Sequence, residues 1–147
     1  MTPEDFEGNW SLVSWEADHL DGTTSSPFGA DPVGVISYGG GRMSCHMAVR
    51  GRTSLARDAE GVPTEAERAR AFVTYVAYAG PYEVVGTDVI HHVDVSLFPG
   101  WVGIDLVRAA RFEGDLLHLT ALMNQGSASE ATHRLVWRAM APGAQLP

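Results

Sequence analysis

Three ionisable side chains lie on otherwise apolar faces of strand-like runs, where they could bind an anion or move a proton. Arg108, His91 and His133 each alternate with apolar residues two positions away in the chain. Residues at that spacing share one face of a strand. A guanidinium inside an apolar core is costly unless an anion or a strong acceptor meets it. Arg108 is therefore predicted to hold a ligand carboxylate, enolate or carbonyl, with His91 beside it as a proton donor or acceptor.

The same residues also have structural interpretations, which the sequence leaves open. Arg108 could pair with a buried acid or reach water at the end of its strand, and His91 could be a hydrogen-bonded core histidine. The other predicted ligand contacts are aromatic, imidazole or aliphatic side chains of the neighbouring runs: Tyr38, Phe72, Tyr75, Tyr82, Trp101, Leu106 and His133.

Motifs of metal and covalent catalysis are absent from the sequence. His91 and His92 are adjacent, so in a strand they point to opposite faces and cannot chelate one ion. All ten basic residues are Arg, and without Lys neither Schiff-base chemistry nor lysine-anchored pyridoxal phosphate is available. The single cysteine, Cys45, alternates with Met43 and Met47, so we interpret it as a small core residue. We expect no metal and no cofactor.

The elements that must position these side chains are mostly strands. Gly39-Gly40-Gly41 indicates a tight hairpin, and similar turn signals separate later runs. The sequence predicts an all-β fold, an eight-stranded antiparallel barrel with one inserted α-helix. The predicted strands are 9–17, 33–38, 42–49, 82–86, 88–98, 102–112, 115–123 and 130–140.

One helix is predicted over 64–79. Thr64 and Glu67 form a capping-box pattern at its start, and Gly80 is expected to end it. Its apolar stripe has two interpretations: it packs against the barrel, or it covers one mouth so that Phe72 and Tyr75 line the ligand site. The stripe consists of Phe72, Tyr75, Val76 and Ala79.

Tryptophans near the two ends of the chain predict where the barrel closes. Trp10 lies in the first strand and Trp137 in the last, and those strands must meet. We expect both to be buried structural residues rather than ligand contacts, with a nearby Arg stacked on the indole. An eight-stranded barrel is about wide enough to hold one small ligand.

Composition limits the class of protein. A length of 147 residues predicts one domain over 1–147. The net charge of −8 argues against nucleic acid and anionic membranes as partners, and no apolar run is long enough to span a bilayer. The acidic N-terminus and single cysteine favour a cytoplasmic protein, as a monomer or homodimer.

Several segments together resemble the lipocalin-like domain family of bacteria and fungi. They are Gly8–Ser14, Pro27–Gly34, Gly41–Ser44, Tyr78–Tyr82, His91–Ser96, Pro99–Gly103 and Leu135–Trp137. The resemblance implies an eight-stranded barrel with a helix insertion, and no single activity.

The predicted function is binding of a small, largely apolar organic molecule in the barrel lumen. The leading hypothesis is a cofactor-free cyclase or isomerase of natural-product biosynthesis, in which the lumen folds the substrate. Arg108 would polarise a carbonyl or stabilise an enolate, with His91 or a tyrosine transferring the proton. The alternative is a non-catalytic binding or carrier protein with the same pocket.

Overall fold

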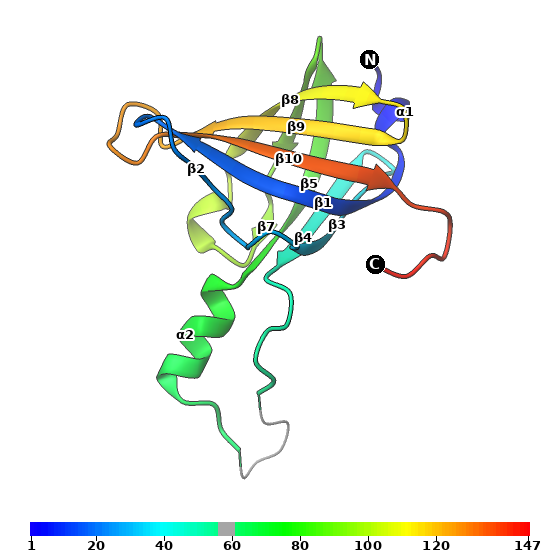
Figure 1. Cartoon of the computed structure of the whole chain (residues 1–147). Helices are drawn as coiled ribbons and strands as arrows, with labels where there is room; N and C mark the ends of the chain where they lie inside the picture. The colour runs from blue at the N-terminus through cyan, green and yellow to red at the C-terminus, as the bar shows by residue number, and fades with distance from the viewer. Residues whose placement is uncertain (56–60) are drawn as a thin grey trace.

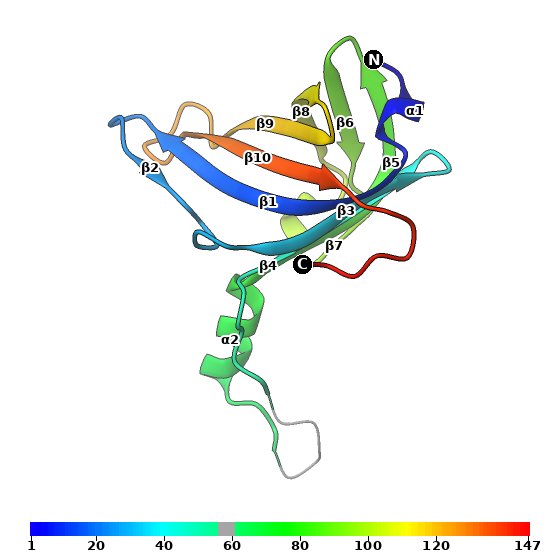
Figure 2. The same ribbon diagram turned by 45° about the vertical axis from the view of Figure 1, so that its right-hand side comes forward.

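Eight antiparallel strands form a closed ring in the computed structural model, which describes residues 1–55 and 61–147 (Figures 1 and 2). Each strand pairs with the next along the ring, and pairing of β10 with β1 closes it. In ring order the strands are β1 (Gly8–His19), β3 (Val33–Gly39), β4 (Arg42–Ala48), β5 (Tyr75–Val85), β6 (Asp88–His92), β8 (Asp105–Glu113), β9 (Leu116–Met123) and β10 (Ala131–Ala139).

Two short strands and three short helical segments complete the described chain. They are β2 (Thr24–Ser25), β7 (Val95–Ser96), α1 (Pro3–Phe6), α2 (Glu65–Val73) and the 3₁₀ segment η1 (Pro99–Trp101). The predicted fold class, an eight-stranded antiparallel barrel with one inserted helix of more than one turn, is confirmed.

The inserted helix is much shorter than the sequence predicts. Its start is correct, because the Thr64 hydroxyl accepts from the Glu67 amide and the Glu67 carboxylate accepts from the Thr64 amide. Its end is wrong: α2 stops at Val73, and the next strand begins at Tyr75. The reason is strand pairing, since seven consecutive residues from Tyr75 onward pair with β4. Gly80 therefore lies inside β5 and does not cap a helix.

The predicted apolar stripe of the helix does not exist as a buried face. No residue of α2 is buried, and Phe72 is 43% exposed. Tyr75, Val76 and Ala79 belong to β5 instead. The helix projects from one end of the barrel and leaves its wall to the strands (Figures 1 and 2).

The predicted strand 88–98 is broken after His92. Val93 donates its amide to Ile104, and Asp94 donates its amide to Ala79, so the chain leaves the ladder there. The two-residue β7 then pairs with β5. In an unbroken strand Val95 and Leu97 would share the inward face of His91, but here they are 59% and 40% exposed.

The end of the barrel next to α1 is filled with aromatic rings. Phe6 is completely buried, and its ring centroid lies 5.3 Å from that of Tyr38 and 5.0 Å from that of Phe112. The Trp10 indole donates to the Phe6 carbonyl at 2.8 Å, which ties the first strand to α1. Trp10 is buried as predicted, and α1 closes this end.

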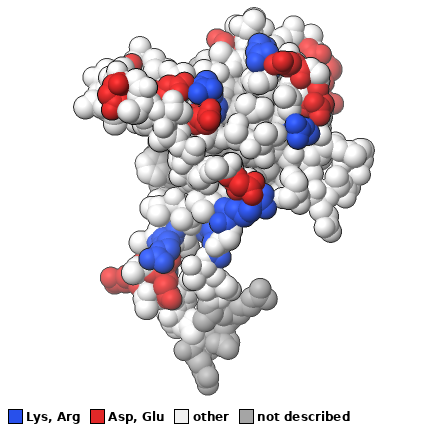
Figure 3. Space-filling view, in the orientation of Figure 1, with Lys and Arg blue, Asp and Glu red and all other residues white. Residues whose placement is uncertain are grey.

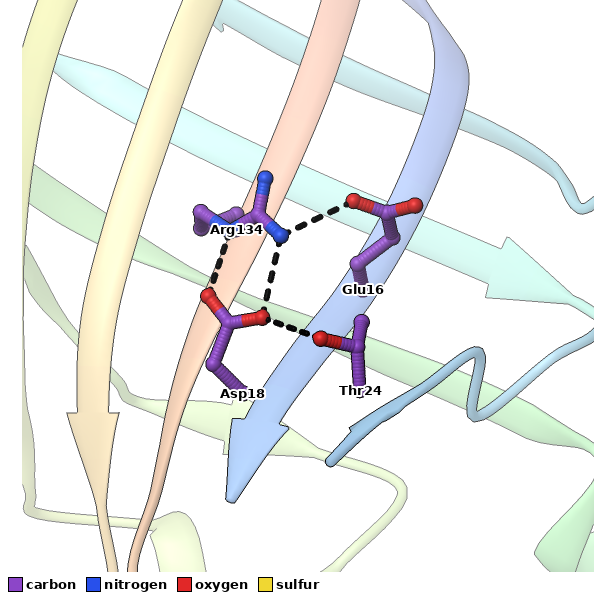
Figure 4. Close-up of polar contacts among 4 residues, drawn as sticks. All are labelled: Glu16, Asp18, Thr24 and Arg134. Carbon is purple, nitrogen blue, oxygen red and sulfur yellow. Dashed lines mark hydrogen bonds and ion pairs between the residues drawn. The ribbon is translucent and has the colours of Figure 1, made fainter. Parts of the chain in front are cut away.

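Ion pairs, and not an arginine stacked on tryptophan, reinforce the seam between β1 and β10. Arg134 of β10 contacts Asp18 at 2.7 Å and Glu16 at 3.1 Å, and Thr24 of β2 donates to Asp18 at 2.8 Å (Figure 4). Arg138 lies away from this ion-pair group and pairs with Asp115, in the turn between β8 and β9. Among the described residues, the cation–π contact is that of Arg52 with Tyr75, whose ring centroid lies 4.9 Å from the guanidinium carbon.

Charges of both signs are interspersed on the surface. On the face drawn in Figure 3, arginine side chains lie beside acidic ones and form no continuous basic stripe. No described helix has the length and hydropathy needed to cross a membrane.

Candidate functional site

A cavity of about 190 Å³ occupies the barrel lumen. Its apolar lining comes from five strands: Ile36, Cys45, Met47, Val76, Leu119, Ala121, Met123 and Leu135. Its remaining lining side chains carry nitrogen or oxygen: Trp15, Tyr78, Trp101, Arg108, His133 and Trp137. The lumen is therefore predominantly apolar, with a small number of polar groups that could orient a ligand.

Arg108 lies on the inward face of β8 and lines the cavity, as the alternation predicts. One guanidinium nitrogen donates to the Val107 carbonyl at 3.1 Å. No acidic side chain of the described chain forms an ion pair with it. The first structural interpretation, a buried acid paired with Arg108, therefore does not hold in this part of the protein. The cation is left with hydrogen-bonding capacity on the side of the lumen.

His91 is completely buried and does not line the cavity. Its Nε2 lies 2.9 Å from the Tyr38 hydroxyl, and its Nδ1 lies 3.2 Å from the Tyr78 hydroxyl. Burial, with Arg108 and His92 adding repulsion, lowers the pKa of His91 to about 3. The ring is therefore neutral near pH 7, and it reaches the lumen only through Tyr78.

Tyr78 is the side chain that links this buried chain of hydrogen bonds to the cavity. Burial raises the pKa of its hydroxyl well above the ordinary value, so the group stays protonated. The sequence prediction missed it because 64–79 was assigned to a helix. The signal was present: Val76, Tyr78, Gly80 and Tyr82 alternate, and in a strand they share one face.

His133 lines the cavity as predicted and has a partner that the sequence did not reveal. The Trp15 indole nitrogen lies 2.9 Å from His133 Nδ1. An indole N–H can only donate, so Nδ1 accepts, and the neutral ring carries its proton on Nε2. Burial, together with Arg108 and His19, lowers the pKa of His133, which favours this neutral form.

Trp137 is 1% exposed, as predicted, and it also lines the cavity. Its expected role as a structural residue away from the ligand site is therefore too narrow. Its indole nitrogen is buried and has no hydrogen-bond partner among the described residues. Cys45 is a core residue as predicted, and burial raises the pKa of its thiol to about 12.

Three of the predicted ligand contacts lie at the closed end and away from the cavity lining. Tyr38 and Tyr82 stack edge to face with ring centroids 4.9 Å apart, and the Tyr82 hydroxyl donates to the Pro3 carbonyl at 3.1 Å. Leu106 is buried on β8 directly opposite His91 on β6. Tyr38 and Leu106 lie next to His91, so they pack behind the polar end of the lumen without reaching the cavity.

The predicted aromatic contacts at the helix lie outside the barrel wall. Phe72 and Tyr75 line an outer groove of about 360 Å³, and the Tyr75 hydroxyl lies 2.9 Å from His46 Nδ1. Trp101 differs from them, because it lines both this groove and the lumen cavity. Its ring contacts Tyr78 edge to face at 5.5 Å, so of the predicted aromatics it alone borders the lumen.

The described residues contain no cluster of three or more His, Cys, Asp or Glu side chains that could hold a metal ion. The polar groups that line the lumen belong to Arg108, Tyr78, His133 and three tryptophans. They can donate hydrogen bonds and compensate negative charge.

A known family profile agrees with this architecture. The profile of a family described as a lipocalin-like domain matches residues 7–140. A 4'-hydroxy-3'-methoxypropiophenone carrier protein of Aspergillus oryzae is 34% identical over an alignment of 67 residues, and the match covers 40% of this chain and 60% of that protein. A solved structure of an uncharacterized protein from Bacteroides eggerthii aligns over 92% of this chain and 100% of its own, with 12% identity and a TM-score of 0.45. Because the family profile covers nearly the whole chain, the protein belongs to the lipocalin-like domain family.

Proposed function

We propose that this protein binds a small, largely apolar organic molecule in its barrel lumen and acts as a carrier or binding protein for it. The observation that carries the proposal is the Arg108 guanidinium, which lines an apolar cavity without an acidic partner in the described chain. Arg108 is half-buried, and a charge held against apolar side chains is unfavourable unless something else compensates it. A carbonyl, phenol or carboxylate of a ligand would do so.

The size of the cavity sets the size of the ligand. A dry apolar cavity of roughly 150 Å³ holds one benzene molecule. The lumen measures about 190 Å³. A single aromatic ring with a few short substituents, or an aliphatic molecule of similar volume, fits that space.

The named relative supports the same class of ligand. Its name describes a carrier for an aryl ketone that bears a hydroxyl and a methoxy group. Such a molecule has one ring, short substituents and several oxygen acceptors, which matches both the volume and the donors of this lumen. This chain spans 60% of that relative, so the aryl ketone is a proposal for this protein.

Isothermal titration with 4'-hydroxy-3'-methoxypropiophenone tests the proposal directly. The wild-type protein should bind it, and Arg108→Met should bind it about ten- to a hundredfold more weakly, because a hydrogen bond to a charged group is worth about 1.5–3 kcal/mol. Methionine retains most of the apolar stem, so loss of packing contributes little. The matched control is Arg111→Met, which removes an exposed arginine of the same strand and should leave affinity unchanged. Equal affinity in Arg108→Met would place the ligand elsewhere.

A second candidate function is cofactor-free isomerisation or cyclisation. It is favoured by one observation, the chain of hydrogen bonds from Tyr38 through His91 to Tyr78 at the cavity wall. Arg108 would stabilise an enolate while the Tyr78 hydroxyl transfers the proton. Against a general-base role, the hydroxyl is held protonated by burial.

Proton exchange at carbon separates the two candidates. Propiophenone in heavy water exchanges the hydrogens next to its carbonyl through the enolate, and this exchange is read by NMR. An enzyme of this kind would accelerate the exchange above the buffer rate and lose the acceleration in Tyr78→Phe. A carrier would bind propiophenone and leave the rate at the buffer level, which is the result we expect.

A further inference from the structure

The polar side chains of the lumen are all hydrogen-bond donors, and this composition says more about the ligand than its size does. Trp15, Tyr78, Trp101, Arg108, His133 and Trp137 are the polar side chains that line the cavity. None of them has a carboxylate or amide oxygen. The Tyr78 hydroxyl can also accept, but it already lies within hydrogen-bond distance of His91 Nδ1. A ligand in this space therefore meets mainly donors and one cation, which favours a ligand whose own polar atoms are acceptors.

The two donors on β10 are unused. The Trp137 indole N–H is buried and has no hydrogen-bond partner among the described residues, an arrangement that is rare in folded proteins. In His133, Nδ1 accepts from Trp15, so Nε2 carries the proton, and no hydrogen bond from Nε2 occurs in the described part of the chain. Both residues lie on β10, and their even spacing in the chain places them on the same face of the strand. Both line the cavity.

Among the described residues that line the cavity, Arg108 is the single charged group. The titratable side chains that interact with it come from five other strands, and each is neutral near pH 7. These side chains are Tyr38, Cys45, Tyr78, His91 and His133. Burial raises the pKa of the tyrosines and of the thiol, and it lowers the pKa of the histidines.

The acidic surface does not cancel this positive charge. The net charge is −8, but charges on the surface are screened by salt over about 8–10 Å, whereas a group beside Arg108 in a largely apolar cavity is not. At the position of a bound ligand, the nearest charge is the guanidinium, so it dominates the local field.

We infer that the lumen selects the anionic form of a weak organic acid, a phenolate, enolate or carboxylate on a small apolar skeleton. Arg108 is the group that selects the charged form, and the Trp137 and His133 N–H groups receive a second acceptor of the same ligand. The inference rests on the proposed function, because it names the class of molecule bound at that site. It predicts that an uncharged ligand of the same shape binds more weakly than the anion.

The test uses 4-nitrophenol, a single-ring phenol that ionises near neutral pH and whose phenolate has its own visible absorption band. Titrating the protein–probe mixture with pH gives the pKa of the bound phenol directly. We expect that pKa to lie at least about one pH unit below that of the free probe, which corresponds to tenfold tighter binding of the phenolate than of the phenol. The matched neutral probe, 4-nitroanisole, should bind about tenfold more weakly than the phenolate.

Variants of Arg108 and Trp137 show which residue causes the shift in the pKa of the bound phenol. Arg108→Met should return the bound pKa to the free value or above it, because an apolar cavity without a cation favours the neutral phenol. Arg108→Lys keeps the charge and should retain most of the shift, and circular dichroism checks that each variant is folded. Trp137→Phe removes the unused donor together with part of the ring and no charge, so it should weaken both probes by a similar factor while leaving the shift in place.

The outcomes separate this inference from the proposed function. Binding of 4-nitrophenol with an unchanged or raised pKa would overturn selection of the anion and leave binding of apolar molecules intact. A lowered pKa that persists in Arg108→Met would overturn the role of Arg108. Failure of both probes and of the aryl ketone to bind would overturn the proposed function as well.

Discussion

Replacing His91 by phenylalanine should destabilise the protein at neutral pH and at the same time make its stability less dependent on pH. His91 is completely buried between two tyrosine hydroxyls, at 2.9 Å from Tyr38 and 3.2 Å from Tyr78. Phenylalanine keeps a planar ring in the same space and removes both hydrogen-bonding nitrogens. The Tyr38 and Tyr78 hydroxyls then remain buried without this partner.

The expected loss at neutral pH follows from these two bonds. Leaving one buried polar group unsatisfied costs about 1–3 kcal/mol. Two such groups predict a decrease of about 2–6 kcal/mol in the free energy of unfolding. Tyr38→Phe in the His91→Phe background should cost less than Tyr38→Phe alone, because their shared bond is already absent.

The pH dependence has a definite sign. Burial lowers the pKa of His91 from an ordinary 6.5 to about 3 in the folded protein. Between those values the unfolded chain binds a proton that the folded protein does not, so wild-type stability is retained above pH 6.5 and decreases as the pH falls toward 3. The slope is at most about 1.4 kcal/mol per pH unit. His91→Phe lacks this group, so its deficit should shrink by up to about 3 kcal/mol between neutral pH and about pH 4.5.

Urea denaturation at a series of pH values measures both effects. His92→Gln is the matched control, since His92 is the next residue, points to the opposite face and has a pKa raised by its hydrogen bond to Asp105. Stabilisation by a raised pKa is present at low pH and is lost as pH rises, so this control should show the opposite trend. A deficit of His91→Phe that is independent of pH would refute the assignment of acid sensitivity to His91.

Three further outcomes are expected. Gly80→Ala should cost about 1–3 kcal/mol or more in urea denaturation, because an added Cβ would overlap the backbone carbonyl of His92; an unchanged midpoint would show that this approach is not fixed. Trp10→Ala should cost about 3–5 kcal/mol by the same assay, since Trp10 is 8% exposed and its indole holds the Phe6 carbonyl. The hydrogen bond from Arg134 lowers the pKa of Asp18 to about 2, so in Arg134→Gln this pKa should rise toward 3.8 in an NMR titration.

Alternation along the strands was sufficient to predict the barrel and the inward position of Arg108. A strand has a side-chain period of two, so a single run of residues already separates its two faces. The same argument placed His91 inside and His92 outside, which the exposures confirm. The capping box at Thr64 was equally readable, because all its partners lie within three residues of one another.

The length of the helix was decided by tertiary structure. Tyr75, Val76 and Ala79 are compatible with one helix face when read alone, but each of them also fits a strand. Pairing of Tyr75 and the six residues after it with β4, whose residues lie some thirty positions away, resolves the ambiguity. Local periodicity contains no information about such a partner, so Tyr78 was missed.

The site itself depends on contacts between residues distant in the chain. His91 meets Tyr38 at a separation of 53 residues, and Trp15 meets His133 at a separation of 118. Strand alternation tells which side chains enter the lumen, but ring closure decides which of them touch, which donors remain unused and how much space is left. The sequence by itself thus determined the barrel and the placement of a cation inside it, whereas only the closed tertiary structure determined the neutral, donor-rich surroundings in which that cation acts.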